Sequence, residues 1–326
     1  MKFYKKVIST LLISSLAVGL TACGSTEKNK ENGKLNVVAT VFAEYDFLRH
    51  IAGDAINLEM LMLPGADLHA FDPTPKDIMK VQEADLFVTI GGESDAWADK
   101  IVDSIDNEEL QTIRLMDCVD NVVEEEVVEG MEAEEHEHDE EAEHEEHEEE
   151  KSFDEHVWTS PKNAIQIVES LCDTLCETDS ANAENYKANT KNYVSKLEEL
   201  DKKFTEVIEN GARKEIIVAD RFPFRYFADA YDLEYYAAFP GCSTQTGASA
   251  ETIAFLIEKV KEDEIPVVFH MELSSETMCN TICDETGAKK AQLNAVHNIS
   301  KQDFDKGIGY LELMQDNVEV LKEALN

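Results

Sequence analysis

Histidine is the residue type in this sequence whose distribution points most directly to chemistry. The nine imidazoles fall into two sets. Four lie close together in one acidic segment: His136, His138, His144 and His147. Five are spread through sequence of folded character: His50, His69, His156, His270 and His297. Because imidazole binds transition metals and also moves protons near neutral pH, the second set decides what kind of site the chain could form.

Two of the spread histidines lie in loops that precede helices. His69 lies in a proline-flanked loop, 63–75, between an expected strand and an expected helix, and His156 lies in 154–161 just before another helix. Ligands of open α/β sheets bind in the loops after the carboxyl ends of parallel strands, so both rings are expected to face a cleft. A single histidine is more often structural than a ligand. His50, in the first expected helix, is assigned that structural role.

Strands and helices that alternate along the chain would position these loops. In the first half, short apolar runs predict strands at 35–42, 58–63 and 86–90. Apolar residues at helical spacing predict a helix through Phe47 that ends at Gly53, and two more helices at 74–83 and 93–105. Alternation at this spacing is typical of βαβ units with a mostly parallel sheet.

A long helix separates this half from a second one. Residues 181–210 contain no proline or glycine and have apolar residues at helical spacing, which predicts a helix about 45 Å long. The alternation then resumes with strands at 215–219, 235–239 and 267–270, and helices at 225–231, 249–261, 276–286 and 304–325. The expected fold is α/β, with two similar lobes of mostly parallel sheets, 35–180 and 212–326, joined by one rigid connecting helix, 181–211.

One acidic segment interrupts the first lobe. The formal net charge of the chain is −40, and residues 124–150 contribute seventeen acidic side chains with no lysine or arginine. Such a composition cannot bury enough apolar surface to offset the entropy of ordering, so 124–151 is expected to be a mobile surface loop in the first lobe. It is either a solvated charge run or, through its four histidines, a weak metal-collecting loop. The acidic chain as a whole disfavours nucleic acid as a partner.

The first residues predict export. Lysines are followed by an apolar stretch, 7–20, that is too short to span a bilayer, and small residues then precede Cys23. The sequence Leu-Thr-Ala-Cys resembles the lipobox of bacterial lipoproteins, which implies a signal peptide at 1–22, lipid on Cys23 and a flexible tether at 23–34; an ordinary cleaved signal is the alternative. The expected location is the extracytoplasmic face of the cell membrane, with contact to the bilayer through the lipid anchor alone.

Six further cysteines lack the spacing of a zinc knuckle. Two pairs, Cys172 with Cys176 and Cys279 with Cys283, are four residues apart and would share a helix face. We interpret the six cysteines as small buried residues, or at most one disulfide, in preference to metal ligands.

A resemblance to a known family rests on three of these features. The sequence around His69, the His-Val-Trp motif at His156 and the long connecting helix resemble the zinc and manganese solute-binding proteins of bacterial ABC transporters, over residues 35–326. The resemblance implies two α/β lobes that trap one metal ion, with His69 and His156 as the first-lobe ligands. It also implies an ABC permease and its ATPase as partners; we expect a monomer.

The same resemblance implies two ligands in the second lobe. The third ligand follows the first strand of that lobe, where Asp220 is the candidate, although it is displaced by about one position from the family motif. The fourth ligand corresponds to His297, with His270 and Glu272 in reserve. Three imidazoles and one carboxylate suit four-coordinate Zn²⁺, whereas Mn²⁺, the alternative, prefers more oxygen ligands.

Two other functions compete with a receptor role. An exported zinc enzyme would need a catalytic motif, but the sequence has no His-Glu-x-x-His, phosphate-binding glycine loop or Gly-x-Ser-x-Gly elbow, so no enzyme is expected. A surface adhesin or structural lipoprotein would be expected to contain sequence repeats, and none is visible.

Overall fold

The structure is a computed structural model that describes residues 33–66, 71–132, 152–245 and 247–326. The first lobe is built on a four-stranded parallel sheet in the order β2-β1-β3-β4. Its strands are β1 (Leu35–Ala39), β2 (Ile56–Met60), β3 (Leu86–Thr89) and β4 (Gln111–Arg114). The central strands β1 and β3 are apolar and buried, as strands covered on both faces must be.

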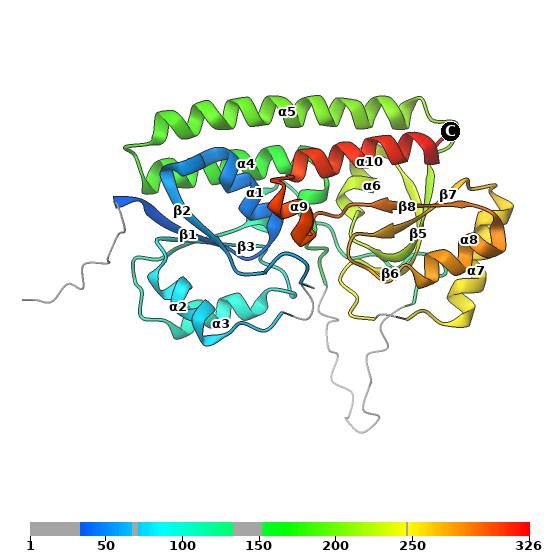
Figure 1. Ribbon diagram of the computed structural model, residues 1–326, viewed down its shortest axis with the longest axis horizontal. Helices are drawn as coiled ribbons and strands as arrows, with labels where there is room; N and C mark the ends of the chain where they lie inside the picture. The colour runs from blue at the N-terminus through cyan, green and yellow to red at the C-terminus, as the bar shows by residue number, and fades with distance from the viewer. Residues whose placement is uncertain (1–32, 67–70, 133–151, 246) are drawn as a thin grey trace, which may run out of the picture. The chain divides into compact units, whose positions relative to one another are not determined.

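Helices cover both faces of this sheet (Figure 1). One face carries α1 and α4, which pack in the main core, and the other carries α2 and α3, which pack in a smaller cluster against β1 and β3. These helices are α1 (Phe42–Ala52), α2 (Pro75–Glu83), α3 (Ala96–Ser104) and α4 (Pro161–Thr178). Short 3-10 turns complete the lobe: η2 (Gly53–Ala55), η4 (Leu115–Cys118) and η5 (Val157–Thr159).

The second lobe repeats this arrangement. Its parallel sheet has the order β6-β5-β7-β8, with β5 (Glu215–Phe222), β6 (Glu234–Pro240), β7 (Val267–Met271) and β8 (Lys289–Leu293). Helices α7 (Ala250–Glu262) and α8 (Thr277–Thr286) cover one face. Helices α6 (Arg225–Tyr231) and α10 (Tyr310–Ala324) cover the other. The prediction of an α/β protein with two similar parallel-sheet lobes is confirmed.

Helix α5 (Ala183–Glu209) packs on helices of both lobes, namely α1 and α4 in the first and α6 and α10 in the second. Its buried face carries Tyr186, Tyr193, Leu197 and Phe204, and these belong to one hydrophobic core that includes residues of both sheets. The sequence predicted this helix to within two residues. None of the helices in the described ranges has the combination of length and apolarity that a bilayer span requires.

Two predictions need correction. The closing helix expected at 304–325 is two helices, α9 (Lys301–Asp305) and α10, because the chain turns at Gly307, whose φ is +75°, and at Gly309. A Cβ on Gly309 would lie 2.9 Å from both carboxylate oxygens of Asp46, and that close approach lets Asp46 accept a hydrogen bond from Tyr310 N at 2.9 Å. A short helix and a glycine turn therefore replace the first turns of the expected helix.

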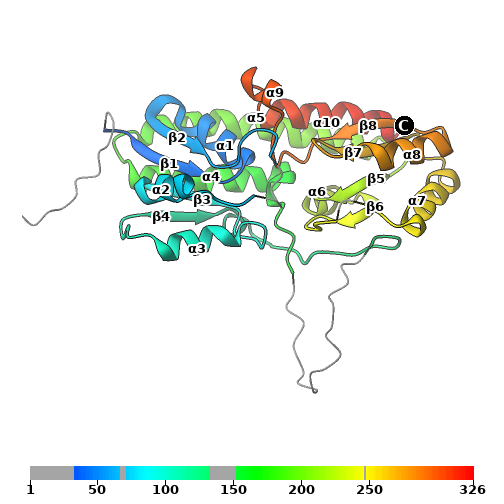
Figure 2. The ribbon, with the colours of Figure 1, turned by 60° about the horizontal axis from the view of Figure 1, so that its bottom comes forward.

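The second correction concerns the start of the acidic segment. Residues 124–132 were expected in a mobile loop of the first lobe, but they are paired: Glu124 bridges to Phe153, and Glu132 N donates to Ala238 O of β6 at 3.0 Å. Glu132 also accepts a hydrogen bond from Ser249 N. Figure 2 shows this segment passing beside β6. The rest of the segment, with its four histidines, lies outside the described residues, as do residues 1–32 with Cys23.

Candidate metal centre

His156 and His297 meet between the lobes. Their ring centroids lie 4.5 Å apart with an interplanar angle of 81°. His156 directly precedes η5 in the first lobe, and His297 lies in the loop after β8 in the second. Trp158 lies against both rings, with centroid distances of 5.6 and 5.5 Å. The structure thus brings together two of the four candidate ligands that the family resemblance implied.

Hydrogen bonds between the lobes fix this meeting. Trp158 Nε1 donates to Ala295 O at 2.8 Å, and Phe42 N donates to His297 O at 3.3 Å. Tyr310 OH donates to Trp158 O at 2.8 Å. Because Trp158, Ala295 and Tyr310 are buried, their bonds hold the two histidine loops in register.

His156 has the environment of a metal ligand. Its side chain is fully buried. Asp154 Oδ1 accepts a hydrogen bond from His156 N at 2.8 Å and lies 3.0 Å from Nδ1, which makes Nδ1 the protonated nitrogen of the neutral ring. Nε2 then carries the lone pair, and it is buried without a hydrogen-bond partner. A buried polar atom left in this way indicates a ligand that completes it.

Charge around His156 favours a cation. Burial by itself lowers the pKa of His156, but the negative charges of Asp154, Glu155 and Glu125 outweigh burial and raise the pKa above its ordinary value. The same carboxylates would stabilise a divalent metal in this position.

A half-buried carboxylate shapes the His297 loop. Glu272 accepts hydrogen bonds from Ala295 N at 2.7 Å and from His297 N at 3.3 Å, and Val296 between them has a φ of +58°. Burial raises the pKa of Glu272 to about 7, although these backbone donors oppose the shift. The other reserve candidate, His270, is buried with Nδ1 2.9 Å from Met271 O. Glu272 therefore positions His297, and His270 is tied to its own strand.

His69 lies outside the described residues, but the segment just before it is fastened beside His297. Asn298 Nδ2 donates to Leu63 O at 2.9 Å and to Ala66 O at 2.7 Å. These two carbonyls belong to the first-lobe loop that leads into His69. The neighbour of His297 thus binds the described start of that loop.

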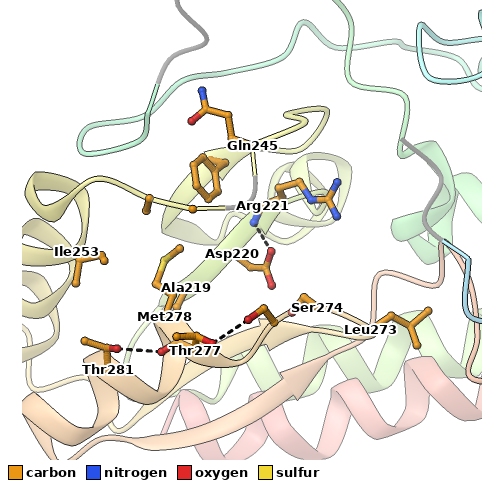
Figure 3. A pocket seen from close by; sticks show the side chains of 14 residues that line it. Ala219, Asp220, Arg221, Gln245, Ile253, Leu273, Ser274, Thr277, Met278 and Thr281 are labelled. Atoms are coloured by element: carbon orange, nitrogen blue, oxygen red, sulfur yellow. Dashed lines mark hydrogen bonds between the residues drawn. The ribbon is translucent and has the colours of Figure 1, made fainter. Parts of the chain in front are cut away.

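Asp220 lies in β5 and hydrogen-bonds to backbone groups of the second lobe. Its carboxylate accepts hydrogen bonds from Arg221 N at 2.9 Å and from Met271 N at 3.4 Å. It lines a pocket of about 430 Å³ in the second lobe together with Leu273, Ser274 and Thr277 (Figure 3). Neither His156 nor His297 lines this pocket. The role of Asp220 as a ligand stays a prediction.

A second set of possible donors was missed from the sequence. Glu155, His156 and Cys242 offer ligand atoms that all lie within 4.8 Å of one another, the one group of three or more His, Cys, Asp or Glu side chains so placed among the described residues. Cys242 follows β6, and no spacing in the sequence links it to His156. In the described structure Cys242 and the five other cysteines after residue 32 are free thiols. Burial raises the pKa of the Cys242 thiol, and the nearby carboxylates of Glu155, Asp154 and Glu125 raise it further.

Known proteins share this architecture. The chain matches the family described as ZnuA, zinc-uptake complex component A, periplasmic, over residues 37–324. It is 33% identical over 324 residues to the zinc-binding lipoprotein AdcA of Streptococcus pneumoniae, an alignment that covers 98% of this chain and 61% of that relative. It is 32% identical over 326 residues to the high-affinity zinc uptake system protein ZnuA of Bacillus subtilis, covering 99% of this chain and 98% of the relative.

Solved structures agree with the fold. The Zn(II)-bound ZnuA-like domain of Streptococcus pneumoniae AdcA superposes with a TM-score of 0.72 at 30% identity, covering 90% of this chain and 99% of that one. The metal-dependent lipoprotein YcdH of Bacillus subtilis gives a TM-score of 0.73 at 29% identity, with the same shares covered.

Two α/β lobes with histidines that meet between them place the chain among proteins with the solute-binding fold. The chain belongs to the ZnuA family, which is a family of transport solute-binding proteins and not an enzyme family. The chain spans 61% of the length of its AdcA relatives from Streptococcus pneumoniae.

Proposed function

We propose that this protein is the extracytoplasmic solute-binding lipoprotein of a metal ABC transporter, which captures Zn²⁺ between its lobes and delivers it to the permease. The observation that carries this proposal is the meeting of His156 and His297 from different lobes, with His156 Nε2 buried and without a hydrogen-bond partner. Neutral imidazole nitrogens in a water-excluded setting suit zinc. The zinc-related names of the relatives agree with this assignment.

The proposed imidazole ligands are His69, His156 and His297, and Asp220 is the carboxylate candidate implied by the family resemblance. The proposed division is a first lobe at 35–180, the connecting helix at 181–211 and a second lobe at 212–326. Zinc is preferred to manganese because two imidazoles, those of His156 and His297, meet in the described part of the site.

The remaining parts of the proposal concern anchoring and partners. Lipid on Cys23, after removal of the signal at 1–22, would hold the protein at the membrane through the tether at 23–34. The partners would be the permease and its ATPase, and the receptor would act as a monomer without catalytic activity. A hydrolase screen of the zinc-loaded protein checks the last point, because turnover would favour the exported zinc enzyme.

The histidines of the acidic segment form an accessory zinc-collecting loop in this proposal: His136, His138, His144 and His147. Deletion of 133–151 leaves the pairings of 124–132 in place and should remove only weak zinc equivalents, with one tight site left. An unchanged zinc stoichiometry in a titration would contradict the accessory role.

The receptor function is tested by metal titration of the purified protein with a competing chelator. One tight equivalent of zinc is expected, with manganese bound far more weakly. Absence of any tight equivalent, or a preference for manganese, would overturn the assignment.

A further inference from the structure

The loop after β6 comes closest to His156 at Gly241. A Cβ built on Gly241 would lie 3.1 Å from His156 Nδ1 and 3.2 Å from Asp154 Oδ2, so a larger residue would press on both groups. The next residue, Cys242, donates its backbone N–H to Glu125 Oε1 at 2.8 Å. The loop is therefore held against the segments that flank His156, and it carries a thiol to the same place.

Glu155 fills the adjacent position with a buried carboxylate. Its side chain is 1% exposed, Oε2 accepts a hydrogen bond from Ser94 N at 3.2 Å, and Oε1 is buried without a hydrogen-bond partner. A Cβ on Gly92 would lie 1.8 Å from Glu155 Oε2, so the carboxylate occupies space that only a glycine leaves. A buried carboxylate oxygen without a donor is costly unless a cation or proton completes it.

The two unpartnered atoms, His156 Nε2 and Glu155 Oε1, are independent signs of a missing ligand, and they belong to two of the three residues in the group that includes Cys242. The ligand atoms of Glu155, His156 and Cys242 all lie within 4.8 Å of one another. Donors around a tetrahedral zinc lie roughly 3.4–3.8 Å apart, given zinc–ligand distances of about 2.0–2.3 Å. A movement of about 1 Å would therefore bring the three donors onto one ion.

We propose that Cys242 is a ligand of the metal bound by His156, with Glu155 as an oxygen donor beside it. This inference rests on the proposed function, because it concerns the same captured ion. On binding, the Cys242 S–H bond is lost, a metal–sulfur bond forms, and the proton leaves to buffer. Cys242 is then an alternative to Asp220 as the second ligand from the second lobe, beside His297; Asp220 accepts hydrogen bonds from two backbone N–H groups.

A thiolate ligand also explains metal choice. Soft sulfur donors select zinc over manganese, which prefers carboxylate, carbonyl and water oxygens. Cys242 is then a specificity residue of the receptor.

Cobalt(II) spectroscopy of the reduced full-length protein tests the assignment. Loading with one equivalent of Co²⁺ should give tetrahedral d–d absorption together with a near-ultraviolet thiolate-to-cobalt charge-transfer band. Cys242→Ser should abolish the charge-transfer band and keep the d–d bands. Cys118→Ser, at a half-buried thiol that donates to Arg114 O, is the matched control and should keep both.

Two further measurements separate structural damage from ligand loss. Cys242→Ser should lower the ratio of zinc to manganese affinity by about tenfold or more, and Cys118→Ser should leave it unchanged. Glu155→Gln should keep the charge-transfer band and weaken cobalt binding by about tenfold. Unchanged affinity in Glu155→Gln would remove Glu155 from the ligand set and overturn that part of the proposal.

The outcomes also separate this inference from the proposed function. If cobalt binds tightly with d–d bands but without a charge-transfer band, or if the band persists in Cys242→Ser, the thiolate ligand is wrong and the receptor function stands. If the wild-type protein binds no stoichiometric cobalt or zinc, both proposals fail.

Discussion

The rings of His156 and His297 lie 4.5 Å apart and nearly perpendicular, although one belongs to the first lobe and the other to the second. Replacing either by alanine should lower zinc affinity by more than roughly 100-fold. This exceeds the loss of affinity expected when a residue that only hydrogen-bonds to a metal ligand is replaced. Titration against a chelator measures this change. His50→Ala is the control. His50 stacks on Tyr193 at 4.3 Å and pairs with Asp46 at 3.5 Å, and neither of these partners is a candidate ligand. Equal affinity in all three variants would contradict the site.

Asp154 orients His156 and should affect zinc without touching it. Asp154→Asn weakens the contact that fixes the Nδ1 proton, so zinc affinity should fall by roughly 10–100-fold while the fold is kept. Near-ultraviolet circular dichroism checks the fold, and Asp229→Asn, which removes the surface pair with Arg225, should bind zinc like the wild type. A normal affinity in Asp154→Asn would show that the orientation of His156 does not depend on this carboxylate.

Trp158 contributes a hydrogen bond between the lobes. Trp158→Phe removes the donor to Ala295 O and leaves that buried carbonyl without this bond, so the free energy of unfolding should fall by about 1–3 kcal/mol. Trp97→Phe is the matched control, because Trp97 Nε1 is buried and has no hydrogen-bond partner. Urea unfolding of the metal-free proteins measures both. A loss in Trp97→Phe as large as that in Trp158→Phe would assign the effect to side-chain volume alone.

Asp95 should make the metal-free protein less stable as pH rises. Its carboxylate accepts hydrogen bonds from Ile90 N at 2.6 Å and Gly91 N at 3.1 Å, and burial raises its pKa to about 7, with Glu155 adding to the shift. The unfolded carboxyl ionises near pH 4, so between about pH 4 and 7 the folded state binds more protons than the unfolded state. This group therefore removes up to roughly 1.4 kcal/mol of unfolding free energy per pH unit over that window; the loss is absent below about pH 4 and complete above about pH 7.

Asp95→Asn should flatten this pH dependence. Urea unfolding at pH 5 and pH 8 in the presence of a chelator gives the comparison, and Asp305→Asn, at an exposed partner of Lys301, should keep the wild-type slope. The same slope in Asp95→Asn as in the wild type would contradict the raised pKa of Asp95.

Much of the fold follows from apolar patterns that local sequence carries. The buried strands β1, β3, β5 and β7 and helix α5 were predictable because their burial imposes apolar runs or helical spacing. The edge strands β4 and β8 were not, because Gln111–Arg114 and Lys289–Leu293 are mostly polar and exposed and gain their structure from pairing with a neighbour. The break before α10 depends on Asp46, which lies far from Gly309 in the sequence.

For the candidate site too, some residues could be predicted from the sequence and others could not. His156 and His297 were identifiable because a family motif surrounds the first and because the second follows a strand of the second lobe. Cys242 and Glu155 were not, because neither spacing nor composition relates the loop after β6 to the residue before His156. Their approach depends on Gly241 and Gly92, which leave room for close contact that only the packed lobes reveal.

The most direct test is a crystal structure of the zinc-loaded protein with anomalous data collected at the zinc edge. A single strong anomalous peak is expected between the lobes, about 2.0–2.2 Å from a ring nitrogen of both His156 and His297. A dominant zinc peak elsewhere, with both rings beyond coordination distance, would contradict the account.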